Sequence, residues 1–60
     1  MINAIFRVYR RNKMVKQVTL ALPNLAIALP KEDISRQFAS DVLEKAKMSG
    51  PYRVKLDCYL

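Results

Sequence analysis

The sequence predicts an α+β fold in which a small antiparallel sheet packs, on one face, against a single amphipathic helix. Three observations support this prediction. Residues 34–48 place apolar side chains at spacings of three and four, the period of a helix with one buried face. In residues 2–10, 14–22 and 52–60 apolar side chains recur at every second position, which is the period of a strand with one buried face. The order is β-β-α-β, and 60 residues make one two-layer domain over residues 1–60.

The predicted helix has identifiable start and stop signals. Asp33 can cap the first turn, or Pro30 can be the first helical residue, with Glu32 beside the positive end of the helix dipole. Gly50 is expected to adopt the left-handed conformation that ends many helices, and Pro51 cannot continue one. The apolar stripe of this helix comprises Ile34, Phe38, Ala39, Val42, Leu43 and Ala46.

The first two strands are expected to form a hairpin. Residues 2–10 and 14–22 are separated by a short polar turn, in which Asn12 tolerates a left-handed backbone. So short a connection makes the two strands antiparallel neighbours. Alternation places Lys16 on the face of the second strand that also carries its larger apolar side chains.

The rest of the sequence predicts one further strand and leaves the secondary structure of one segment undecided. Pro23 ends the second strand, and residues 25–29 fit either a short fourth strand or a packed connection. Residues 52–60 form the last strand, with Cys58 on the core face as a small buried hydrophobe and Tyr59 on the opposite face. A helix that returns from the second strand to the last gives the sheet order second, first, last.

Charge is distributed unevenly along the chain. Eleven Lys and Arg against five Asp and Glu give a net charge of +6. Residues 1–23 contain bases and no acid, whereas bases and acids cancel over residues 24–50. The basic excess therefore belongs to the strands and not to the helix.

Composition excludes several functional classes and favours a non-enzymatic protein. The chain has no histidine, so the commonest general base is missing, and its single glycine rules out a Gly-rich phosphate loop. One cysteine provides neither a disulfide nor a zinc site, so we expect no metal and no cofactor. A core this small is marginally stable unless it is very well packed or the chain associates, for instance as a homodimer. No secretory signal or membrane-spanning run is found, and an unpaired cysteine suits the cytoplasm.

The sheet face that the helix leaves uncovered is the expected binding site. Arginine and lysine neutralise phosphates, and tyrosine stacks on bases, so a basic, Tyr-bearing face favours nucleic acid as the partner. The candidate binding residues on this face, at the hairpin tip and on the second strand are Arg7, Tyr9, Arg10, Arg11, Lys13, Lys16, Arg53, Lys55 and Tyr59.

A protein partner is the alternative. Ile5 and Val15 are apolar residues on the uncovered face, and with Tyr9 and Tyr59 they would form an exposed patch of the kind that marks an interface. The chain would then be a phage- or plasmid-type small module that binds and inhibits a larger host protein, or that self-associates. A basic strand face is also compatible with a solvated surface that has no ligand. The sequence alone leaves these interpretations open.

Overall fold

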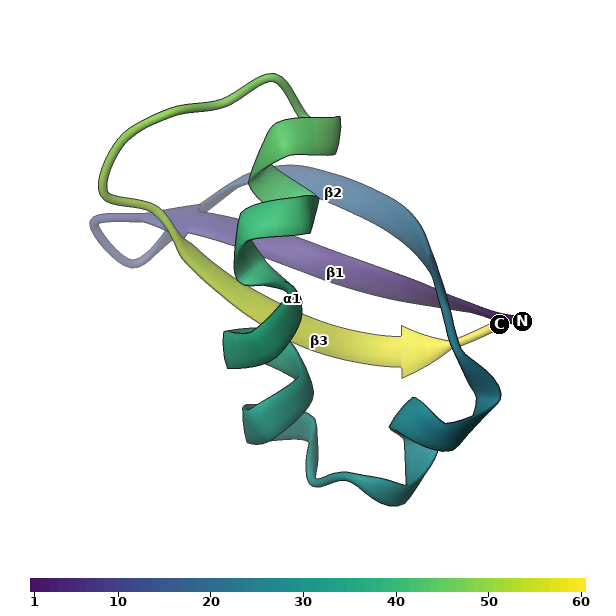
Figure 1. Ribbon diagram of the computed structural model, residues 1–60. Coiled ribbons are helices and arrows are strands. Elements are labelled where there is room, and N and C mark those ends of the chain that lie inside the picture. Colours follow the sequence, from purple (N-terminus) through teal and green to yellow (C-terminus); the bar gives the residue numbers. More distant parts are fainter.

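All 60 residues are described by a computed structural model, which contains a three-stranded sheet and one α-helix (Figure 1). The sheet order is β2-β1-β3, and β1 pairs antiparallel with both neighbours. The helix lies over one face of the sheet, which confirms the predicted α+β fold and strand order. The elements are β1 (Ile2–Arg10), β2 (Lys13–Leu22), the 3-10 helix η1 (Asn24–Ala28), α1 (Lys31–Lys45) and β3 (Arg53–Tyr59).

A two-residue turn joins β1 and β2. Arg11 and Asn12 both have positive φ angles, 52° and 65°, as a type I′ hairpin turn requires. The predicted left-handed backbone at Asn12 is confirmed. Arg11 adopts the same conformation, although arginine is not a residue type that indicates it. Because Arg10 pairs directly with Lys13, β2 begins one residue earlier than predicted.

The helix begins and ends three residues before the predicted 34–48. Pro30 is the N-cap and α1 starts at Lys31, so Glu32 and Asp33 both lie in its first turn. The sequence allows two starts for this helix. The observed start at Lys31 lies one residue after the second of them, in which Pro30 is the first helical residue. The carboxylates then face the positive end of the helix dipole, which stabilises this start without a capping side chain.

The left-handed residue that follows the end of α1 is Lys47 and not Gly50. Lys47 has a φ of 57°, and its N–H donates to the Glu44 carbonyl at 3.1 Å. The Met48 N–H donates to the Leu43 carbonyl at 2.9 Å, which completes a Schellman motif. Met48 and Leu43 both pack against the core, so burial of this pair fixes where the helix stops. The prediction for Gly50 is wrong: it has a φ of 127° in the loop before β3.

The segment between β2 and α1 is a packed connection. Residues Asn24–Ala28 form the 3-10 helix η1, in which Ala26 is buried. The Ala26 N–H donates to the Pro23 carbonyl at 2.9 Å, and the Leu29 N–H donates to the Ala26 carbonyl at 3.0 Å. Because the backbone satisfies itself locally, residues 25–29 add no fourth strand to the sheet.

The core lies between the sheet and α1. Its largest fully buried side chains come from every main element except β3: Phe6, Val8, Leu22, Ile34 and Val42. From β3, Leu56 is buried and Val54 is partly buried against the same cluster. The sheet side of the core is therefore formed by alternate residues of all three strands.

A β-bulge in β3 reverses the predicted faces at the end of the strand. Leu56 pairs with Phe6 but Cys58 pairs with Ile5, so Asp57 is an extra residue on β3. One inserted residue moves every following side chain to the other face. Cys58 is accordingly exposed, and Tyr59 packs against the core. The predictions of a buried Cys58 and of Tyr59 on the uncovered face are both wrong.

Candidate functional site

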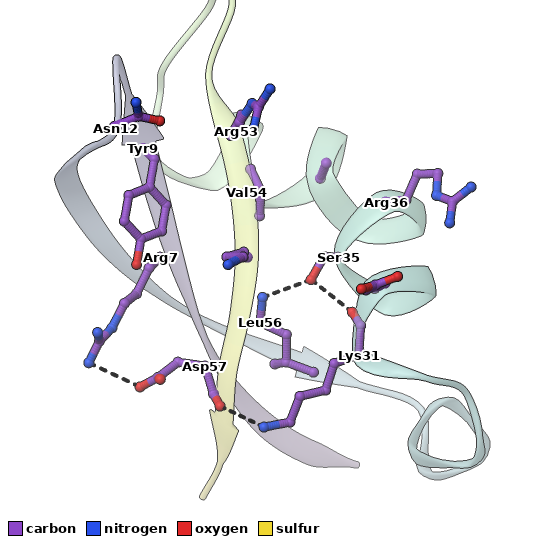
Figure 2. Close-up of a pocket in the computed structure, with 13 residues that line it drawn as sticks. Arg7, Tyr9, Asn12, Lys31, Ser35, Arg36, Arg53, Val54, Leu56 and Asp57 are labelled. Carbon is purple, nitrogen blue, oxygen red and sulfur yellow. Dashed lines mark hydrogen bonds and ion pairs between the residues drawn. The ribbon is translucent and has the colours of Figure 1, made fainter.

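A shallow, open depression of about 920 Å³ lies over β3 and its outer edge. Figure 2 shows Arg7 and Tyr9 of β1 on one side of β3, and Lys31, Ser35 and Arg36 of α1 on the other. We call this surface the basic depression. It is lined by Arg7, Tyr9, Asn12, Lys31, Glu32, Ser35, Arg36, Ala39, Arg53, Val54, Lys55, Leu56 and Asp57.

Positive charge dominates the basic depression. Its lining contains five basic and two acidic side chains, which leaves an excess of three positive charges. Arg7 pairs with Asp57 at 3.2 Å, and Arg36 pairs with Asp33 at 3.0 Å. Arg53 and Lys55 are exposed and belong to neither ion pair. These two side chains are the cations most available to a ligand.

The sheet register surrounds Tyr9 with cations. Tyr9 lies directly across from Arg53, and Arg7 lies directly across from Lys55, in the β1–β3 pairing. Alternation along β1 places Arg7 and Tyr9 on the face opposite the buried Phe6 and Val8. Tyr9 is half-buried as a residue and lines the basic depression, so part of it is accessible to a ligand.

The structure gathers four of the nine predicted binding residues in the basic depression: Arg7, Tyr9, Arg53 and Lys55. Arg10 instead lies over the Tyr52 ring, 5.9 Å from its centroid. Lys16 pairs with Val8 on the helix side, and its Nζ donates to the Ala46 carbonyl at the end of α1 at 3.3 Å. The remaining three residues are outside the depression: Arg11, Lys13 and Tyr59.

The predicted apolar interface patch is dispersed. Ile5 is half-buried and lies across from Cys58. Val15 is the unpaired residue of a second bulge, because Val8 pairs with Lys16 and Tyr9 pairs with Met14. With Tyr59 packed on the core, these residues do not form one exposed island on the uncovered face.

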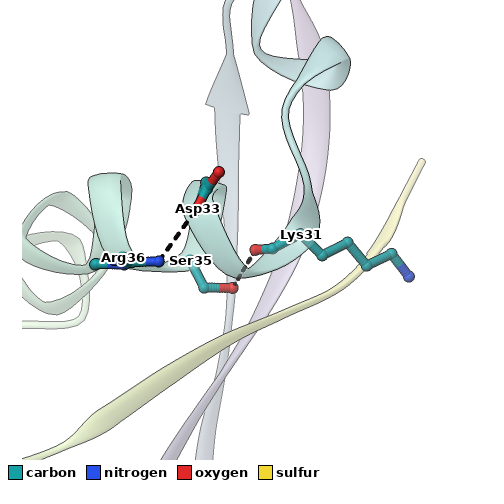
Figure 3. A network of polar contacts seen from close by, with 4 residues as sticks. All are labelled: Lys31, Asp33, Ser35 and Arg36. Carbon is teal, nitrogen blue, oxygen red and sulfur yellow. Dashed lines mark hydrogen bonds and ion pairs between the residues drawn. The ribbon is translucent and has the colours of Figure 1, made fainter.

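The helix contributes residues that the sequence did not assign to the site. Lys31 and Ser35 lie in the first turns of α1, and the Ser35 hydroxyl donates to the Lys31 carbonyl at 2.8 Å (Figure 3). The same hydroxyl accepts the Leu56 N–H at 2.8 Å, and Lys31 Nζ donates to the Asp57 carbonyl at 3.1 Å (Figure 2). These bonds hold the start of α1 against the outer edge of β3. The four-residue spacing of Ser35 and Ala39, both small, is the signal that could have indicated this close approach.

No cluster of three or more potential metal ligands occurs in the structure. None of its helices has the length and apolar character needed to cross a membrane. Comparison with protein-family models, curated proteins and solved structures finds no match.

Proposed function

We propose that this protein is a non-enzymatic binding protein that holds nucleic acid in the basic depression. The observation that carries the proposal is the placement of Tyr9 beside two unpaired cations, Arg53 and Lys55, on one open surface. Cations of this kind neutralise phosphates and release counterions. A base stacked on a tyrosine contributes roughly 1–3 kcal/mol to binding.

The spacing and pairing of the cations suit a phosphate backbone. Arg53 and Lys55 are two residues apart on β3, so their Cα atoms lie about 7 Å apart along the strand. Arg7 is paired with Asp57, but both side chains are partly exposed. An exposed ion pair contributes at most about 1 kcal/mol, so a phosphate can displace the carboxylate from Arg7 at little cost.

The position of Tyr9 favours a single strand over a duplex. The ring is half-buried at the sheet surface, so only a base that leaves its own stack can lie on it. A duplex keeps its bases stacked and presents mainly its backbone to such a surface. We therefore expect duplex DNA to use the cations alone and to bind more weakly.

The test is fluorescence anisotropy with labelled mixed-sequence single strands and duplexes, titrated over a range of salt concentrations. Lys55→Gln should weaken binding and reduce the magnitude of the logarithmic salt slope by about 0.7 for a single strand. Tyr9→Leu should weaken binding about 5- to 150-fold, the equivalent of roughly 1–3 kcal/mol, with the salt slope unchanged. Lys47→Gln is the matched control, because it removes the same charge at the end of α1, outside the depression.

Two results would argue against the proposal. One is absence of binding at low salt, where phosphate contacts are strongest. The other is equal loss of affinity in Lys47→Gln and Lys55→Gln, which would indicate attraction by net charge without a site.

A protein ligand is the second candidate, supported by the part of the β3 edge that lies before the Leu56 amide, which Ser35 already binds. The Leu56 N–H donates to Ser35, so it points away from β1. Backbone groups alternate along an antiparallel strand, and those of Val54 therefore also face the open edge. An extended acidic segment could pair with Val54 there, with Lys55 and Arg36 beside it. Competition between an acidic peptide and an oligonucleotide for the same surface would separate the two candidates.

A further inference from the structure

One of the two acidic side chains in the basic depression is already bound to one of its cations. The Asp57 carboxylate lies 3.2 Å from Arg7, measured from Oδ2 to Nη2. Figure 2 shows Arg7 reaching this carboxylate from one side of β3, while Lys31 reaches the carbonyl of the same residue from the other. The second acid of the lining, Glu32, belongs to no ion pair. Asp57 is therefore the one lining carboxylate that occupies a cation of the depression.

The bulge in β3 holds Asp57 at this position. As the extra residue after Leu56, Asp57 has no cross-strand partner on β1. Its backbone is nevertheless fixed, because its carbonyl accepts Lys31 Nζ at 3.1 Å and the preceding amide donates to Ser35 at 2.8 Å. Bulges commonly re-aim a side chain in this way. The carboxylate is thus kept beside Arg7 by the fold itself and is present at the site whenever a ligand arrives.

The contact between these two side chains is a weak one. It joins one nitrogen of Arg7 to one oxygen of Asp57, and Arg7 Nε is buried without a hydrogen-bond partner. The strong pairs between arginine and a carboxylate are those in which two parallel N–H groups bind both oxygens. The two side chains are also 41% and 37% exposed, so water and salt screen the attraction between them. A phosphate can therefore compete for Arg7, and the carboxylate opposes it.

We propose that Asp57 is an internal competitor that limits how tightly the basic depression holds a phosphate. This role rests on the nucleic-acid function proposed above and identifies a residue that sets its affinity. Arg7 and Asp57 together carry no net charge, so Arg7 exerts its full attraction only when the carboxylate is absent. A strand bound at Arg53 and Lys55 must displace the carboxylate before it gains a contact with Arg7. The depression therefore releases its ligand more readily than its number of cations indicates.

The experiment is a double-mutant cycle on the full chain, measured by fluorescence anisotropy with a labelled mixed-sequence single strand at several salt concentrations. Asp57→Asn removes the charge and keeps the carbonyl that Lys31 binds. Asp41→Asn is the matched control, because Asp41 is exposed on α1, forms no ion pair and lies outside the depression. Asp57→Asn should tighten binding about two- to fivefold more than the control does, the range expected for loss of an exposed ion pair. The magnitude of its logarithmic salt slope should also rise, by up to about 0.7.

Arg7→Gln distinguishes competition for Arg7 from simple repulsion between Asp57 and the ligand. If Asp57 competes, Arg7→Gln should weaken binding about two- to fivefold more in the Asp57→Asn background than in the wild type. Equal losses in the two backgrounds, or equal affinities of Asp57→Asn and Asp41→Asn, would overturn the role of Asp57 and leave the nucleic-acid proposal standing. Absence of binding at low salt by both the wild type and Asp57→Asn would overturn both. Circular dichroism of each variant confirms that the compared chains are folded.

Discussion

Replacement of Ser35 by alanine tests how the helix is held to the sheet. The Ser35 hydroxyl is buried; it accepts the Leu56 N–H at 2.8 Å and donates to the Lys31 carbonyl at 2.8 Å. Ser35→Ala leaves the buried Leu56 amide without a partner, which costs about 1–3 kcal/mol. The better helix propensity of alanine offsets about 0.5 kcal/mol of this loss. The free energy of unfolding should therefore fall by about 0.5–2.5 kcal/mol.

The chain contains its own control for this substitution. Ser40 is also a serine inside α1, but it is exposed and makes no side-chain hydrogen bond. Ser40→Ala changes helix propensity alone and should stabilise the protein by a few tenths of a kcal/mol. Urea denaturation followed by circular dichroism measures both variants. A loss of 1 kcal/mol lowers the Tm of a domain this small by roughly 4–8 °C, so the two variants should be clearly separated.

Hydrogen exchange locates the effect. In Ser35→Ala the Leu56 amide should exchange faster relative to the other amides of β3, because its acceptor has been removed. The reasoning would be refuted if Ser35→Ala and Ser40→Ala had the same urea midpoint. It would also be refuted if protection of Leu56 were unchanged in a destabilised Ser35→Ala.

Three further predictions concern other local features. Lys47→Gly should raise the free energy of unfolding by about 0.5–1 kcal/mol, because glycine adopts the positive φ of Lys47 without strain; an unchanged urea midpoint would contradict this. Cys58 should react with Ellman's reagent in the folded protein as fast as an unstructured thiol, whereas reaction only after unfolding would contradict the bulge at Asp57. Lys16→Met should cost about 0.5–1 kcal/mol at low salt and less at high salt, since it removes a cation from the end of α1; a salt-independent loss would indicate packing instead.

Hydrophobic period alone predicts most of this fold. Strand and helix periods differ enough that four segments are assigned correctly, and the β-β-α-β order then leaves few arrangements of the sheet. Element ends depend on weaker, local effects. The helix end is decided by the hydrogen bond from the Met48 N–H to the Leu43 carbonyl and by the packing of both side chains against the core. No single residue type indicates this, so Gly50 is the more obvious but incorrect choice.

The candidate site is harder to predict because a bulge leaves no mark on the alternation pattern. Asp57 breaks the register of β3, so Cys58 and Tyr59 exchange the faces that strict alternation assigns to them. Residues before the bulge, such as Arg53 and Lys55, stay where the pattern places them. The contribution of α1 is missed for another reason: the helical period leaves the start of the helix open between two positions and does not indicate that Lys31 lies beside the edge of β3.

Chemical-shift mapping by nuclear magnetic resonance tests the central proposal most directly. A chain of 60 residues gives a spectrum in which each backbone amide can be followed while a single-stranded oligonucleotide is added at low salt. If the basic depression is the binding site, the largest shifts should occur at Arg7, Tyr9, Arg53 and Lys55, with the amides of η1 unmoved. Shifts centred on other elements, or a spectrum that does not change, would contradict the proposal.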